Sequence, residues 1–132
     1  METLENILHN HNLSMTGPRK SVFNLLVSAD MPMSIAGITY ELRTIDRATV
    51  YRTVKTFEDI GVTKRVWFGQ RSKYELSEEF KAHHHHLVCE KCGLITKVVN
   101  KDLERLVNKI ARKSGYRHTH HHIEIFGHCD KH

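Results

Sequence analysis

Residues 46–61 read DRATVYRTVKTFEDIG and predict a helix with one apolar face. Asp46 suits the N-cap position, and Gly61 suits the position just after the last helical residue. The apolar residues recur at the i, i+4, i+7, i+10 spacing that places side chains on one side of a helix: Val50, Val54, Phe57 and Ile60. The helix should therefore bury this stripe and leave a polar outer face.

Two shorter helices and a hairpin are expected around this helix. Pro18 suits the first turn of a helix that runs to about Ser28, and Ser34 suits the N-cap of a short helix before residue 43. Residues 62–68 and 73–76 predict two strands around the turn-rich stretch Gly69-Gln70-Arg71-Ser72. Three helices and a basic hairpin in this order are typical of a winged helix-turn-helix.

The outer face of the third helix carries side chains that suit DNA: Arg47, Thr49, Tyr51, Arg52 and Lys55. In a major groove, arginine reads guanine edges, while threonine and tyrosine contact phosphates and thymine methyl groups. An ordinary solvated helix face with scattered charges would show the same periodicity, so the pattern alone leaves both interpretations open.

The positive charge is concentrated where DNA contact is expected. The chain has 132 residues and a formal net charge of +5, with 20 basic and 15 acidic side chains. Residues 43–73 hold eight basic and three acidic side chains, whereas residues 74–80 hold three glutamates and no basic side chain. A concentrated basic stretch favours phosphate contact more than a diffuse charge does.

The composition excludes a membrane-spanning protein, because no run of about 18 apolar residues occurs. The chain does not open on a secretory leader, and three cysteines cannot all pair with one another. We therefore expect a soluble, cytoplasmic protein with reduced thiols.

The C-terminal half predicts a small α/β domain. Strands are expected at residues 87–89, 94–99 and 121–126, and a helix at residues 102–113. That helix has an apolar stripe that we expect to be buried: Leu103, Leu106, Val107 and Ile110. The predicted fold class is α+β, with a winged-helix DNA-binding domain at residues 1–77 and an α/β domain at residues 78–132.

The cysteines have the spacing of a zinc site. Cys89 and Cys92 form a CxxC knuckle, and Cys129 and His132 form a CxxH pair at the end of the sequence. Tetrahedral Zn²⁺ accepts three thiolates and one imidazole, and a closed site of this kind is structural. A redox CxxC is the rival interpretation, but it would not need Cys129 and it lacks the strand-to-helix setting of such motifs.

Ten of the twelve histidines lie in the last 50 residues and could bind further metal. In an extended run, His83 and His85 point to one face while His84 and His86 point to the other. A second site could combine imidazole and carboxylate ligands that suit Zn, Fe, Mn, Ni or Co: His83, His85, Glu104 and His121. The alternative is a set of surface histidines without a ligand.

Three segments together resemble the ferric uptake regulator family. They are MTGPR at residues 15–19, RATVYRTV at residues 47–54 and HHHHLVCEKCG at residues 83–93, followed by FGHC at residues 126–129. The resemblance covers nearly the full length. It implies a homodimer with an N-terminal winged helix, a C-terminal dimerisation domain and metal-dependent binding to double-stranded operator DNA.

The resemblance also assigns roles to residues. It places Cys89, Cys92 and Cys129 in a structural zinc site, with His132 as the fourth ligand, and adds Arg19 to the expected DNA contacts. It assigns binding of the sensory metal to His83, His85, Glu104 and His121.

The family also has a hinge metal site, and here the match is partial. Glu75, His84 and His86 occupy its positions, but another ligand falls at or beside Pro32 and an acidic ligand is replaced by Lys97. A lysine ammonium group would repel a divalent cation.

The function we expect is a metal-dependent DNA-binding repressor that controls metal homeostasis, with zinc uptake as the first candidate. The structural cofactor would be Zn²⁺, and the effector Zn²⁺, Fe²⁺, Mn²⁺ or Ni²⁺. The alternatives are an iron- or peroxide-responsive member of the same family and a histidine-rich metal-storage or delivery protein. We expect no enzyme, because a zinc hydrolase needs an open metal position and a general base.

Overall fold

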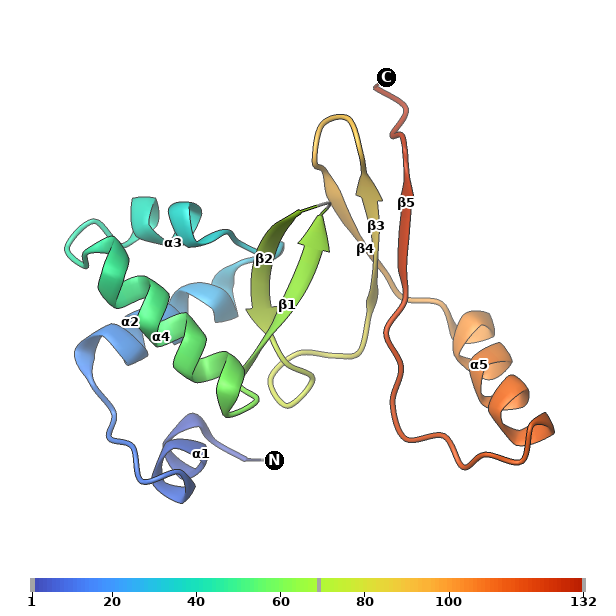
Figure 1. Ribbon diagram of the computed structural model, residues 1–132, viewed down its shortest axis with the longest axis horizontal. Helices are drawn as coiled ribbons and strands as arrows, with labels where there is room; N and C mark the ends of the chain where they lie inside the picture. Colours follow the sequence, from blue (N-terminus) through green and yellow to red (C-terminus); the bar gives the residue numbers. More distant parts are fainter. Residues whose placement is uncertain (1, 69, 132) are drawn as a thin grey trace. The chain divides into compact units, whose positions relative to one another are not determined.

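The computed structural model describes residues 2–68 and 70–131, which form two compact units (Figure 1). The first unit is Met1–Ala82 and the second is His83–His132. No helix among the described residues is both long enough and apolar enough to cross a membrane.

The described residues of the first unit form four helices and a hairpin. The elements are α1 Leu4–Asn10, α2 Gly17–Ser28, α3 Ile35–Glu41, α4 Arg47–Asp59, β1 Thr63–Phe68 and β2 Arg71–Leu76. The side chains of Thr3, Thr16 and Ser34 cap the first three helices by accepting a backbone N–H. At the start of α4 the Thr49 hydroxyl donates to the Asp46 carboxylate at 2.5 Å.

Helix α4 is the centre of the apolar core of this unit. Its residues Val50, Val54 and Phe57 are at most 1% exposed, and they share the core with residues of α1, α2, α3 and the hairpin. Gly61 follows the helix with φ +82°, a backbone conformation that glycine adopts without strain. The predicted apolar stripe of this helix and the predicted end of the helix before Gly61 are therefore confirmed.

The hairpin is antiparallel and its turn is shorter than predicted. Strand β2 already begins at Arg71, which pairs with Phe68, because the register continues to the end of β1. Met33 adds a short bridge to Tyr74 through backbone hydrogen bonds of 2.8 and 2.7 Å. These features complete the predicted winged helix.

Helix α1 is an element that the sequence analysis did not predict. Leu4, Ile7 and Leu8 are buried and pack into the core of the first unit. Their i, i+3, i+4 spacing behind the Thr3 cap is the signal that would have indicated it.

Residues 83–131 of the second unit form a three-stranded sheet and one helix: β3 His85–Cys89, β4 Ile95–Val98, α5 Lys101–Lys113 and β5 Glu124–Gly127. The strand order is β4-β3-β5, with β4 antiparallel and β5 parallel to β3 (Figure 1). The central strand β3 therefore has a hydrogen-bonded neighbour on each side.

Two expectations for this unit are wrong. The last strand begins at Glu124 rather than at His121, because pairing with β3 begins opposite His86. The apolar stripe of α5 is not buried within a single chain: all residues of this helix are described, none is buried, and Leu106 and Ile110 are 51% and 57% exposed. The helix contacts too little of its own unit to cover that stripe.

Replacing the central core aromatic should destabilise the first unit. Phe57→Ala removes a side chain that is 0% exposed, and the resulting cavity should lower the free energy of unfolding by about 3–5 kcal/mol. Tyr51→Ala, on the exposed side of the same helix, should change it by less than about 0.5 kcal/mol. Urea denaturation followed by circular dichroism tests this, and equal losses for the two variants would contradict the assigned helix faces.

Candidate metal centres

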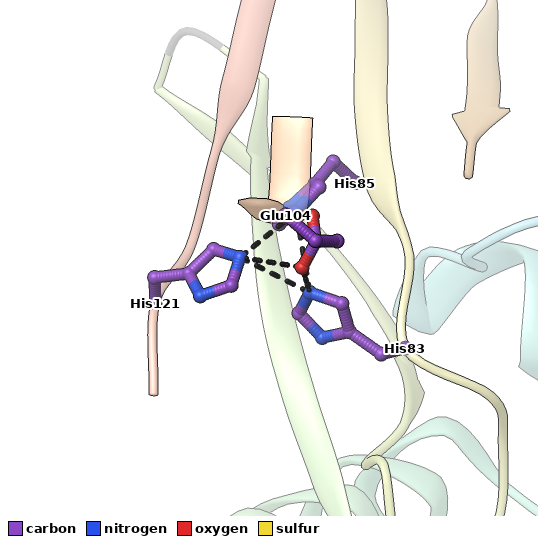
Figure 2. A group of neighbouring side chains, drawn as sticks. All are labelled: His83, His85, Glu104 and His121. Atoms are coloured by element: carbon purple, nitrogen blue, oxygen red, sulfur yellow. Dashed lines mark hydrogen bonds and ion pairs between the residues drawn. The ribbon is translucent and has the colours of Figure 1, made fainter. Parts of the chain in front are cut away.

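Four side chains from three segments converge in the second unit, and we refer to them as the histidine cluster: His83, His85, Glu104 and His121. His83 precedes β3, His85 opens it, Glu104 lies in the first turn of α5, and His121 lies before β5. Figure 2 shows the three imidazole rings and the carboxylate pointing toward one another.

The spacing of the ligand atoms matches a tetrahedral metal site. The Nε2 atoms of His83, His85 and His121 lie 3.1–3.2 Å apart. The Glu104 carboxylate oxygens lie 2.7–2.9 Å from these nitrogens. A tetrahedral zinc ion with bonds of about 2.0–2.1 Å separates its ligand atoms by about 3.3 Å. The cluster therefore needs only small shifts to hold such an ion.

The electrostatic environment also suits a cation. Burial lowers the pKa of His85, although the hydrogen bond with Glu104 opposes this, so the ring is biased toward its neutral, metal-binding form. Desolvation acts to raise the pKa of Glu104, but the hydrogen bond with His85 and the adjacent histidines bring it below its ordinary value. An ionised carboxylate beside neutral imidazoles is a ligand set for a divalent ion.

Three thiols form a second group, the cysteine cluster of Cys89, Cys92 and Cys129. The Sγ atoms of Cys92 and Cys129 lie 3.7 Å apart, and all three cysteines are free. Zinc–sulfur bonds of about 2.3 Å in a tetrahedron give a sulfur–sulfur separation of about 3.8 Å. The described thiols therefore have the spacing of three zinc ligands.

Backbone hydrogen bonds stabilise the thiolate form of Cys89 in this cluster. The N–H groups of Cys129 and Cys92 donate to Cys89 Sγ at 3.4 and 3.5 Å and lower the pKa of that thiol to about 6. For Cys129, the backbone of Lys131 lowers the pKa, but desolvation and the other two sulfurs outweigh it and raise the pKa. Crowded thiolates of this kind are stabilised by a bound cation.

Two other predictions, the fourth ligand of the zinc site and the hinge metal site, stay predictions. His132 lies outside the described residues. Of the hinge residues, Glu75 belongs to the first unit, whereas His84 and His86 belong to the second, where their ring centroids are 4.9 Å apart. Glu75 forms an ion pair of 3.5 Å with Lys64. Lys97 is the cross-strand partner of His86.

The predicted DNA-contact residues lie on α2 and on the outer side of α4. Tyr51 is 54% exposed, and Lys55 is exposed although it pairs with Glu58 and Asp59 at 3.7 and 3.8 Å. Arg47 is exposed at the first position of α4.

A polar depression between α2 and α4 brings the remaining predicted residues together. Arg19, Thr49 and Arg52 all line it, and the Arg52 guanidinium donates to the Thr49 hydroxyl at 3.2 Å. Arginine and threonine side chains that open toward solvent in this way are suited to contact phosphates or base edges.

One contact beside the histidine cluster was missed by the sequence analysis. His118 Nε2 lies 2.8 Å from His121 Nδ1, on the side of the ring that faces away from the cluster. Spacing could not have indicated it, since residues 114–123 form no helix or strand.

Comparisons with known proteins agree with the geometry. The model of the ferric uptake regulator family matches residues 10–126. The ferric uptake regulation protein of Neisseria meningitidis serogroup A is 34% identical over 137 aligned positions, covering 98% of this chain and 94% of that protein.

Solved structures extend the comparison. The Vibrio cholerae ferric uptake regulator has a TM-score of 0.78 and 29% identity, covering 92% of this chain and 96% of the other. A zinc-bound manganese uptake regulator has a TM-score of 0.71 and 32% identity, covering 97% and 99%. The predicted fold class is confirmed by these likenesses. The chain belongs to the ferric uptake regulator family and is a metal-responsive transcriptional regulator.

Proposed function

We propose that this regulator is a cytoplasmic homodimer that represses metal-uptake genes when a divalent ion occupies the histidine cluster. The observation that carries the proposal is the convergence of four ligand atoms at tetrahedral spacing. Zn²⁺ is the effector that fits best, because it accepts three imidazole nitrogens and one carboxylate without demanding further ligands. Fe²⁺, Mn²⁺ and Ni²⁺ are the alternatives to test beside it.

We assign sensing to the histidine cluster rather than to the hinge residues because of two lysines. The Glu75 carboxylate is engaged by Lys64, and His86 faces Lys97 across the β3–β4 ladder. Each ammonium group would oppose a divalent cation there. In the histidine cluster, the carboxylate of Glu104 instead contacts the Nε2 atoms of three imidazoles.

The cysteine cluster supports a structural role for a second zinc ion. It joins the β3–β4 connection to the segment after β5, which are distant in sequence. A bound ion would contribute folding free energy to a unit that has few buried apolar residues. We propose His132 as its fourth ligand.

A second copy of the chain is the partner that the exposed apolar side chains favour. Leu106 and Ile110 of α5, together with Ile125 and Phe126 of β5, are 46–57% exposed. Exposed apolar side chains on a unit with few buried ones favour an interface with another chain. Covering them in a homodimer would also supply two recognition helices for a pseudo-palindromic operator.

Metal could act on DNA binding through the connection between the units. His83 is both a member of the histidine cluster and the first residue of the second unit. An ion that fixes His83 against α5 and His121 would therefore hold the chain at the point where it leaves the DNA-binding unit. Coupling of this kind makes metal and operator bind more tightly in each other's presence.

Removing the charge of the cluster carboxylate should abolish metal-dependent operator binding. Glu104→Gln keeps the shape of the side chain but removes a ligand, so we expect the affinity for Zn²⁺ at this cluster to fall at least about 100-fold. Asp102→Asn is the matched control, since it makes the same charge change in the same exposed first turn of α5. Gel-shift titrations on the protein's own promoter, with metal and with chelator, measure the response. Equal operator affinity of the wild type with metal and with chelator would contradict the proposal.

Disrupting the knuckle should remove the structural zinc. Cys92→Ser replaces a thiolate by a hydroxyl, and we expect less than one zinc ion per chain at the cysteine cluster and a monomeric or aggregating protein. Lys91→Ala changes an exposed neighbour in the same loop and should leave both properties intact. Elemental analysis and light scattering check this; a stable Cys92→Ser dimer with full zinc content would rule out the assigned role.

Shortening one arginine of α4 should weaken operator binding alone. Arg52→Ala should cost about 1–3 kcal/mol of specific binding if the side chain reads a base edge, with metal content unchanged. Arg112→Ala, an exposed residue of α5 with the same change in charge, is the control. Fluorescence anisotropy at two salt concentrations measures both variants. An unchanged operator affinity of Arg52→Ala would show that this side of α4 does not read the operator.

A further inference from the structure

His121 is a member of the histidine cluster that no regular element holds. It lies between the end of α5 at Lys113 and the start of β5 at Glu124. The ladder to β3 begins at Glu124, and the nearest backbone bond runs from the N–H of His86 to the carbonyl of Ile123 at 3.5 Å. The orientation of the His121 ring must therefore depend on contacts of the ring itself.

Both nitrogens of this ring have a defined neighbour. Nε2 faces the cluster, 2.9 Å from a Glu104 carboxylate oxygen, and Nδ1 lies 2.8 Å from Nε2 of His118. The His118 and His121 rings are tilted by 44°, with centroids 4.9 Å apart. His118 is partly buried, so this contact is only partly open to water.

The geometry points to His118 as a positioning residue that fixes the tautomer and the ring plane of His121 for metal binding; this rests on the proposed metal site. A neutral imidazole that gives its Nε2 lone pair to an ion carries its proton on Nδ1. That proton has its acceptor in Nε2 of His118, which therefore carries its own proton on Nδ1. Partners of this kind orient ligand histidines and raise their basicity.

The neighbouring histidines do not share this role. His120 and His122 are both exposed, and the hydroxyl of Thr119 lies 3.2 Å from His120 Nδ1. His118 is also not a member of the histidine cluster, because its Nε2 is directed at the far side of the His121 ring. It acts through His121 rather than on the metal.

The test compares three variants of the full-length protein with zinc already in the cysteine cluster. His118→Ala removes the acceptor, and the affinity for Co²⁺ or Zn²⁺ at the histidine cluster should fall about 10- to 100-fold in chelator competition. His118→Gln offers a side-chain carbonyl as acceptor and should retain affinity within a few-fold of the wild type. His120→Ala removes an exposed imidazole from the same segment and should leave the affinity unchanged.

Two spectroscopic measurements distinguish positioning from ligation. X-ray absorption of the Co²⁺-loaded protein should show the same number of nitrogen ligands in His118→Ala as in the wild type. Nitrogen-15 NMR of the Zn²⁺-loaded protein should show a hydrogen-bonded Nδ1–H group of His121 in the wild type, and the same proton should exchange faster with water in His118→Ala.

The outcomes separate this inference from the function on which it rests. Wild-type affinity in His118→Ala, with an impaired Glu104→Gln, would overturn the inference alone. Loss of one nitrogen ligand in His118→Ala would also overturn it, since His118 would then be a ligand. Wild-type affinity in Glu104→Gln would overturn the proposed metal site and the inference together.

Discussion

The contact of Glu104 with three imidazoles is the interaction on which the second unit depends. It joins α5, which has no buried residue of its own, to the start of β3 and to the segment before β5. The buried hydrophobic residues described in this unit are Val88, Cys89 and Ile95, whereas the first unit has a continuous core built around Phe57. Small units with so little buried apolar surface usually need metal ions, cross-links or a partner to fold. Metal binding and folding are therefore expected to be coupled here.

Strand β3 links the two clusters because side chains alternate along a strand. His85 and Cys89 lie four residues apart and so project from the same face of β3, one into each cluster. Pairing with β4 on one side and β5 on the other holds this strand in a fixed register. A zinc ion at Cys89 would anchor one end of the strand and leave the other end to respond to a second ion at His85. A structural site and a sensory site can thus share one strand without sharing a ligand.

The sequence predicted the elements whose signals are local. Helix α4 was predicted because its cap, its stripe and its final glycine all lie within residues 46–61, and the CxxC knuckle was evident from spacing. Helix α1 was missed because its apolar stripe is short, and the last strand was misplaced because alternation around His121 is also compatible with a loop. Whether an apolar stripe is covered depends on the tertiary structure and on partner chains. The exposure of the stripe on α5 could therefore not be predicted from the sequence. The contact of His118 with His121 depends on loop geometry that has no sequence period.

Charge alone cannot explain how one bound ion would switch DNA binding. In the metal-bound state, three neutral imidazoles and one carboxylate around a divalent ion have a net charge of about +1. The basic segment of residues 43–73 already has eight positive side chains against three negative ones. This segment can attract phosphates without the ion, so we expect the ion to act mainly through conformation. In the proposed mechanism that effect begins at His83, which belongs to the histidine cluster and directly follows Ala82, the last residue of the first unit.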